Sequence, residues 1–244
     1  VQTCALPISA LKLTTGEFVA FLDHDDELRP HALLEVAKVI IQNPEAKLIY
    51  SDEDKIDEIG RRYDPYFKPD WNPDLLLGQN YICHLTVLDT WLVKKISGFR
   101  KGYEGSQDWD LILRFSEKIV ANSIFHVPHV LYHWRANIGS TALSMKQKQN
   151  VFGNSLKSVK SAMNRRNIGS KVNLLNDETN YTQVLYEIDN RNPKVSILIP
   201  TKDRVGILRK CISLVKETVS YKNYEIIIIN NESRDINTLK NLEK

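Results

Sequence analysis

The chain has little of several features that mark specialised classes of protein. Its 244 residues include three cysteines, Cys4, Cys83 and Cys211, which form neither a metal-ligand spacing nor an even disulfide framework. A reduced, cytoplasmic setting is therefore expected. No apolar run approaches the roughly 20 residues that span a bilayer, so attachment to the inner face of a membrane would need a segment outside this chain. The net charge is only +3 and the Lys and Arg residues are scattered, which argues against nucleic acid as a partner.

The composition is that of an ordinary globular protein, with 42% hydrophobic and 26% charged residues. Apolar residues recur at helical spacing over residues 33–41, behind Pro30, and Asn43-Pro44 ends that helix before a strand at 47–50. Residues 64–73 are rich in proline and aromatic residues, which predicts an irregular surface segment. The alternation of strands and helices predicts an α/β fold.

Three carboxylates follow an apolar run at residues 18–22, which reads as a buried strand. They belong to the stretch Asp23-His24-Asp25-Asp26. In open α/β sheets, ligands bind beyond the carboxyl ends of the strands, and carboxylates there suit Mg²⁺ or Mn²⁺ with a substrate phosphate. Acidic residues after a strand are also ordinary turn formers and helix caps, so this pattern alone leaves both interpretations open.

Four ordered motifs carry a resemblance that extends from about Ala10 to Arg135. They are Thr15-Gly16-Glu17-Phe18-Val19-Ala20-Phe21-Leu22-Asp23-His24-Asp25-Asp26, Tyr50-Ser51-Asp52-Glu53-Asp54-Lys55, Glu104-Gly105-Ser106-Gln107-Asp108-Trp109-Asp110 and Leu131-Tyr132-His133-Trp134-Arg135. Together they resemble family-2 glycosyltransferases of the GT-A fold, and in particular bacterial polysaccharide and rhamnosyltransferase-like members. The resemblance implies a nucleotide-sugar donor and a glycan or lipid-linked glycan acceptor.

The resemblance also implies roles around a bound Mn²⁺ or Mg²⁺. Asp25 is the first choice as direct ligand, while Asp23 helps at the ribose or through a water, and Asp26 orients its neighbours. His133 could bring an imidazole to the same metal, although a lone His beside aromatic residues is equally well explained as structural. Arg135 suits a donor diphosphate because a guanidinium makes bidentate contacts.

Asp108 has two interpretations. It stands near the start of a predicted helix at 109–115, where Asp commonly caps exposed N–H groups. In the family that the chain resembles, the Asp at this position is the catalytic base of inverting transfer. Trp109, beside it, is a candidate for stacking on an acceptor sugar, against the default of a core aromatic. Asp52 and Asp54 are candidates for acceptor contact, against the alternative that they are turn residues.

A second resemblance begins at Val195, where residues 195–204 look like the first strand and loop of the same fold and residues 224–233 like its second strand. Thr201, Asp203, Arg204 and Asn230 are then candidate donor-binding residues. Asn230 replaces the Asp that the family normally has at the end of this strand, which puts selectivity for the base in doubt.

The motif order predicts two incomplete halves of GT-A domains. Residues 1–145 form the metal, catalytic and acceptor part of a first transferase domain, residues 146–193 a helical and strand connector, and residues 194–244 the nucleotide-binding start of a second domain. Residues 1–8 do not fit the family pattern and receive no function. One hypothesis is that the unfinished sheet edges of the two halves pair with each other.

Two functions stay open at this point. The first is a metal-dependent inverting glycosyltransferase of surface polysaccharide (O-antigen-like) biosynthesis, of which this chain alone would be inactive. The alternative is a non-catalytic glycan- or nucleotide-binding scaffold module of a tandem transferase.

Overall fold

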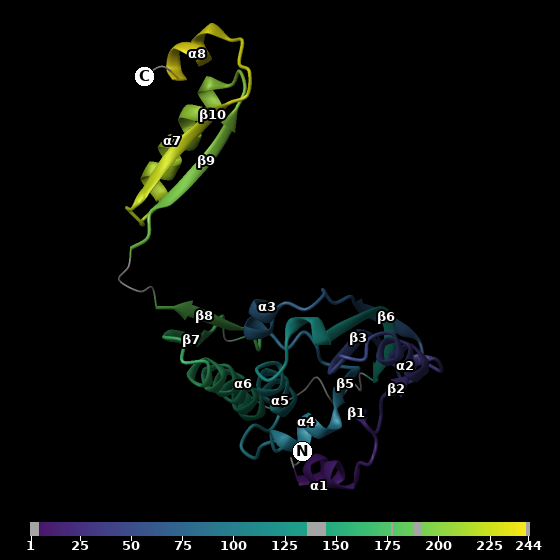
Figure 1. Ribbon diagram of the computed structural model, residues 1–244. Helices are drawn as coiled ribbons and strands as arrows, with labels where there is room; N and C mark the ends of the chain where they lie inside the picture. Colours follow the sequence, from purple (N-terminus) through teal and green to yellow (C-terminus); the bar gives the residue numbers. More distant parts are fainter. Residues whose placement is uncertain (1–4, 136–144, 177, 188–191, 243–244) are drawn as a thin grey trace. The chain divides into compact units, whose positions relative to one another are not determined.

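The computed structural model describes residues 5–135, 145–176, 178–187 and 192–242. The chain divides into two compact units, Val1–Glu187 and Ile188–Lys244, and each is described by itself (Figure 1). In the part of the chain that the structure describes, no helix has both the length and the apolar character needed to cross a bilayer.

The first unit combines six α-helices, one 3₁₀ turn and eight strands among its described residues. The helices are α1 (Ala5–Leu13), α2 (Ala32–Gln42), α3 (Pro73–Gly78), α4 (Thr90–Lys95), α5 (Gln107–Ser116) and α6 (Met145–Arg165), with the 3₁₀ turn η1 at Ala121–Ser123. The strands are β1 (Phe18–Ala20), β2 (Glu27–Leu28), β3 (Leu48–Ile56), β4 (Arg62–Tyr66), β5 (Thr86–Asp89), β6 (Ile124–Arg135), β7 (Ser170–Leu174) and β8 (Thr182–Tyr186). The α/β class is confirmed.

The main sheet has the strand order β1-β5-β3-β6-β2, with β4 added to β3. β3 and β6 are parallel, whereas β5 runs antiparallel to both β1 and β3. Because of these directions, β1, β3 and β6 end on the same side of the sheet on which β5 begins. The candidate site lies at the strand ends on that side.

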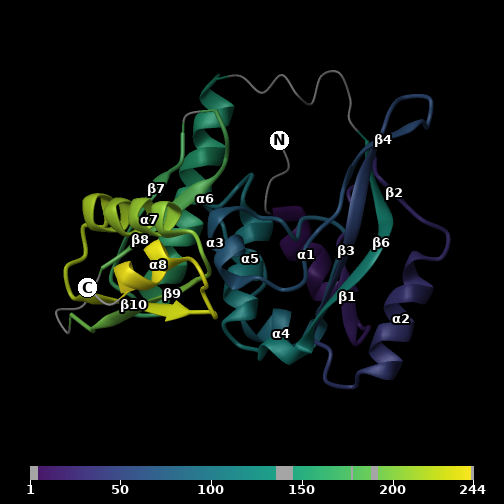
Figure 2. The ribbon, with the colours of Figure 1, turned by 90° about the horizontal axis from the view of Figure 1, so that it is seen from above.

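Helices cover both faces of this sheet (Figure 2). On one face, Leu48 and Tyr50 of β3 pack in a large core with residues of α3, α4, α5 and α6, including Trp109. On the other face, Ile49 packs with Val36 of α2. The alternation of neighbouring β3 residues between two cores follows from the period of two in a strand.

The helix α6 is part of the packed core of the first unit. Its residues Val159, Ala162 and Met163 are buried against α5 and the rest of that core. The strands β7 and β8 follow as an antiparallel pair, and the division into compact units falls after Glu187. Much of the segment predicted as a connector, residues 146–193, therefore belongs to the first unit. The connector was predicted because the sequence changes there to a basic helical region, but one side of that helix is buried.

Three strand predictions needed correction. The run at 18–22 was predicted as a buried strand, but β1 covers only Phe18–Ala20 and is partly exposed at the sheet edge, where it pairs with β5 alone. β3 continues to Ile56, so the acidic residues predicted to follow the strand lie within it. The segment 64–73 contains the end of β4 and the buried Lys68, so it is neither wholly irregular nor wholly at the surface.

The second unit is a small βαβα arrangement. Its elements are β9 (Val195–Thr201), α7 (Val205–Thr218), β10 (Tyr224–Asn230) and α8 (Ile236–Leu242). β9 and β10 are parallel, and they form a two-stranded sheet of their own. The pairing of sheet edges between the two halves stays a prediction.

Candidate functional site

The loop between β1 and β2 carries the acidic motif, and Tyr132 of β6 holds it in place. The Tyr132 hydroxyl donates a hydrogen bond to the Asp26 carboxylate and accepts one from the backbone N–H of Asp23, at 3.2 Å. The backbone N–H of Arg135 donates to the other oxygen of Asp26, at 2.8 Å. Partial burial nevertheless raises the pKa of Asp26, with a smaller upward contribution from the neighbouring charge of Asp23.

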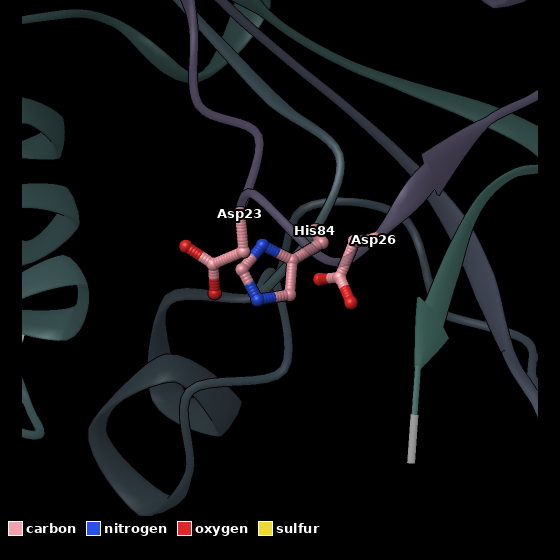
Figure 3. A group of neighbouring side chains, drawn as sticks. All are labelled: Asp23, Asp26 and His84. Carbon is pink, nitrogen blue, oxygen red and sulfur yellow. The ribbon is translucent and has the colours of Figure 1, made fainter. Parts of the chain in front are cut away.

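One group of side chains among the described residues is arranged to hold a metal ion. It consists of Asp23, Asp26 and His84, each of which offers a ligand atom, and these atoms lie within 4.8 Å of one another. Figure 3 shows the imidazole of His84 with the two carboxylates on either side. Atoms bound to one small divalent ion at roughly 2.1 Å lie no more than about twice that distance apart. Two carboxylates and an imidazole near this spacing suit Mn²⁺.

His84 reaches the group because it stands just before β5, which runs antiparallel to β1. Its ring stacks on the ring of Tyr132, with centroids 4.6 Å apart and planes at 13°. Tyr132 therefore contacts all three members of the group. It holds Asp23 and Asp26 through its hydroxyl, and His84 through its ring.

The structure does not bring the predicted ligands Asp25 and His133 into this group. Asp25 lies on the exposed side of the loop, and its carboxylate is 3.7 Å from Nδ1 of the neighbouring His24. His133 is buried, and its Nδ1 hydrogen-bonds to Asp54. Arg135, predicted to contact the donor, instead braces the loop: its Nε donates to the backbone oxygen of Asp25 at 2.8 Å, and its guanidinium pairs with Glu27.

A cavity of about 440 Å³ adjoins the group, and both Asp23 and His84 line it. Asp108, in the first turn of α5, lines the same cavity, as does Asn80, whose side-chain amide donates to the Asp108 carboxylate at 2.8 Å. Burial raises the pKa of Asp108, and the neighbouring His84 opposes this rise. The N-cap position of α5 is Ser106, so Asp108 is not the cap residue. The sequence-predicted residues Asp23 and Asp108 thus meet at one cavity.

Three residues predicted to contact the acceptor are internal instead. Trp109 is 1% exposed, and its indole N–H donates to the backbone oxygen of Leu76 at 2.7 Å. Asp52 and Asp54 are each 3% exposed. Asp52 accepts one hydrogen bond from the backbone N–H of Lys68 and interacts with His126, while Asp54 pairs with Arg62 and His133. Their carboxylates are occupied by internal partners, because β3 extends through them and carries them into the packed sheet.

Three residues at the site went unpredicted by sequence reasoning, namely Asn80, His84 and Tyr132. The sequence offers a weak signal for His84, which immediately precedes the strand-like run at 85–88. Placing it would have required knowing that β5 runs antiparallel to β1, and strand direction cannot be read from one sequence.

In the second unit, the predicted residues gather at the carboxyl ends of the parallel strands. The Asp203 carboxylate accepts hydrogen bonds from the backbone N–H groups of Arg234 and Asp235, which lower its pKa. The Asn230 side-chain oxygen accepts from the backbone N–H of Ser233, at 3.0 Å. Thr201 is buried at the end of β9, and Arg204 is the N-cap residue of α7. These contacts tie the loop after β9 to the loop after β10.

Comparison with known proteins finds a family match in the second unit and relatives along most of the chain. Residues 196–244 match the model of Glycosyl transferase family 2. The chain is 34% identical over 229 residues to the O-antigen biosynthesis protein RfbC of Myxococcus xanthus, and this match covers 94% of the chain and 18% of that protein. It is 41% identical over 233 residues to the uncharacterized protein y4gI of Sinorhizobium fredii (strain NBRC 101917 / NGR234), covering 95% of the chain and 25% of that protein.

Residues 196–244 therefore match part of a glycosyl transferase family 2 domain. The chain is also a homologue of an O-antigen biosynthesis protein, and it spans a quarter or less of the length of these two relatives.

Solved structures give weaker likenesses. Staphylococcus aureus TarS in complex with UDP matches with a TM-score of 0.40 and 16% identity, over 65% of this chain and 49% of that one. Glucosyl-3-phosphoglycerate synthase from Mycobacterium tuberculosis, in complex with Mn²⁺, UDP-glucose and phosphoglyceric acid, matches with a TM-score of 0.42 and 16% identity, over 63% and 54% of the two chains.

Proposed function

We propose that this chain belongs to a metal-dependent inverting glycosyltransferase that moves a sugar from a nucleotide-sugar donor to a glycan acceptor in surface polysaccharide biosynthesis. The family match at 196–244 and the relationship to an O-antigen biosynthesis protein support the reaction class. The observation that carries the proposal is a single cavity that is lined by Asp108 and by two members of the metal group, Asp23 and His84, with Asp26 beside them in that group.

The metal-binding residues in this proposal are Asp23, Asp26 and His84, in place of the pair Asp25 and His133 predicted from the sequence. A divalent ion there would neutralise the negative charge that develops on a departing diphosphate. The chain's own part is to hold the Asp26 carboxylate toward the ion and to favour its charged form. Tyr132 and the backbone N–H of Arg135 serve this by donating hydrogen bonds to Asp26.

Asp108 is the proposed base. As the acceptor hydroxyl oxygen bonds to the anomeric carbon and the bond to the diphosphate oxygen breaks, the hydroxyl proton passes to the Asp108 carboxylate. Three features suit it to this role: it lines the cavity, its pKa is raised by burial, and the side-chain amide of Asn80 holds one of its oxygens. The other oxygen then faces the acceptor in our proposal.

The domain organisation remains part of the proposal. Residues 1–145 supply the metal and catalytic half of one transferase domain, to which the structure adds α6, β7 and β8 as packed elements. Residues 194–244 supply the nucleotide-binding start of a second domain, with Thr201, Asp203, Arg204 and Asn230 at the strand ends that would face a donor.

The test is nucleotide binding by the complete protein. Calorimetry with UDP as the probe should show binding that requires Mn²⁺ and that Asp26→Asn weakens by roughly 10-fold or more. Equal affinity for UDP with and without Mn²⁺ would overturn the metal assignment. A complete protein that binds UDP and Mn²⁺ but transfers no sugar from any of a panel of UDP- and dTDP-sugars to lipid-linked glycan would favour the scaffold alternative.

A further inference from the structure

The side chain of Lys68 is buried and binds Glu53 of β3 together with the short segment just before β5. Its ammonium pairs with Glu53 at 3.0 Å, and it also donates to the backbone oxygens of Ile82, at 2.7 Å, and of His84. The side chain itself is 0% exposed. A buried charge costs free energy unless it is paired and fully hydrogen-bonded, and all three ammonium protons of Lys68 have partners.

Glu53 binds the backbone N–H of His84, while Lys68 binds the backbone oxygen of the same residue. The carboxylate oxygen that pairs with Lys68 also accepts the backbone N–H of His84, at 3.0 Å. The buried ion pair therefore grips both the N–H and the C=O of His84.

The backbone around His84 needs such support. The preceding residue, Cys83, has a φ of +37°, a conformation that non-glycine residues rarely adopt. Conformations of this kind persist only where surrounding contacts over-determine them, and they gather at functional sites. The hydrogen bonds from Lys68 and Glu53 to the backbone of His84 are contacts of this kind, and they fix the backbone from which the imidazole extends toward the metal group.

We propose that Lys68 and Glu53 are positioning residues that aim the imidazole of His84 at a divalent cation held with Asp23 and Asp26. The inference rests on the metal site of the proposed function. It explains why the acidic run of β3 and the proline-rich segment before α3 belong to the same site without lining the cavity. Neither side chain is a ligand in the group, and each acts through His84.

The chain offers a close control for the loss of a buried cation. Arg114 of α5 pairs with Asp110 at 2.9 Å and donates to the backbone oxygens of Ile96, at 2.8 Å, and of Gly98. Like Lys68, it binds one carboxylate and two carbonyls, and it is 7% exposed. None of its partners belongs to the metal group.

The experiment measures Mn²⁺ binding by the 244-residue chain, from the loss of the free-ion signal in electron paramagnetic resonance, with urea unfolding in parallel. Lys68→Met should weaken Mn²⁺ binding by roughly 10-fold or more, within the range expected for partners of metal ligands. Arg114→Met should lower stability while changing Mn²⁺ affinity by less than about 2-fold. Equal weakening by the two variants, or none by Lys68→Met, would overturn the inference.

A second variant covers the case in which Lys68→Met does not fold. Glu53→Gln keeps an oxygen that can accept from His84 but removes the charge that holds Lys68, so a smaller weakening, of roughly 3-fold or more, is expected at unchanged secondary structure. Unchanged affinity in a folded Glu53→Gln chain would then reject the inference. Asp26→Asn and His84→Ala distinguish a failure of the metal site from a failure of the positioning role. If both leave Mn²⁺ binding intact, the metal site itself is wrong; if both weaken it and Lys68→Met does not, only the positioning role fails.

Discussion

Replacing Tyr132 with Phe tests whether one hydroxyl organises the acidic loop. The ring is fully buried, and Phe preserves its shape and its stacking on His84. The lost hydroxyl makes two hydrogen bonds, one to the Asp26 carboxylate and one from the Asp23 backbone N–H. A hydrogen bond to a charged group contributes roughly 1.5–3 kcal/mol and a neutral one roughly 0.5–1.5 kcal/mol. Because the loop is partly exposed, water can replace part of these two hydrogen bonds, and we expect Tyr132→Phe to lower the free energy of unfolding by about 1–3 kcal/mol.

The same substitution should weaken metal binding. Tyr132 lowers the pKa of Asp26, so its removal leaves the carboxylate more readily protonated and less well oriented. Mn²⁺ affinity at neutral pH should fall by roughly 10- to 100-fold, with a larger loss at pH 5 because protons compete for Asp26.

Tyr50→Phe is a matched control for this experiment. Tyr50 is also a buried strand tyrosine stacked on a histidine, His126, at 4.9 Å, and its hydroxyl donates to the backbone oxygen of Pro69 at 2.7 Å. The Tyr50→Phe variant should be less stable than the original chain but bind Mn²⁺ with the same affinity. If Tyr132→Phe matched Tyr50→Phe in Mn²⁺ affinity at both pH values, the loop would not depend on this hydroxyl.

Three further predictions concern individual carboxylates. Because burial raises the pKa of Asp108, its ionised form destabilises the fold. Asp108→Asn should therefore raise the urea midpoint at pH 7, with the gain vanishing below the ordinary carboxyl pKa of 3.8, while turnover of the complete protein falls by at least roughly 10²-fold; retained turnover would require another base. Asp25→Asn should change Mn²⁺ affinity less than about 3-fold where Asp26→Asn changes it more than roughly 10-fold, and the reverse order would restore the ligand predicted from the sequence. The pKa of Asp203 is lowered by backbone N–H groups, so its contribution is present above pH 3.8 and is lost as the pH falls through its folded-state pKa. Asp203→Ala should speed amide exchange at Arg234 and Asp235 at neutral pH, with little difference in strong acid, and unaltered exchange at neutral pH would show that the loops do not need this carboxylate.

Much of the fold could be predicted because local pattern and tertiary structure agree. The periodic run at 33–41 became α2, the helix expected at 109–115 became α5, and the apolar runs of the second unit became the parallel strands β9 and β10. The length of β3 could not be predicted. Its polar second half resembles a turn in sequence, but hydrogen bonding to β4 and β6 on both sides keeps it extended. Tertiary pairing overrides local preference there.

The candidate site was predictable only where its residues follow the motif pattern. Asp23 and Asp108 meet at the cavity, as the resemblance implied, but His84 replaces His133 as the nearby imidazole. The reason is topological. His133 lies within β6, opposite Asp54 of the parallel strand, so its side chain is used inside the sheet. His84 precedes an antiparallel strand, and this carries it back to the edge where β1 ends.

The acidic residues of β3 and those of the loop after β1 differ in whether cationic or imidazole side chains pair with them. In β3, Asp54 has Arg62 and His133 as partners, and Asp52 has His126, so these buried carboxylates are already balanced by cationic or imidazole groups. Asp26 is partly buried yet receives only a tyrosine hydroxyl and a backbone N–H, and no cationic side chain pairs with it among the described residues. Burial raises the pKa of Asp26, and these two hydrogen bonds only partly offset that rise. A divalent cation beside Asp26 would supply the missing charge, so Mn²⁺ should stabilise the chain to urea, and Asp26→Asn, which removes the uncompensated charge, should abolish most of that gain. An equal gain in both forms would mean that the ion binds elsewhere.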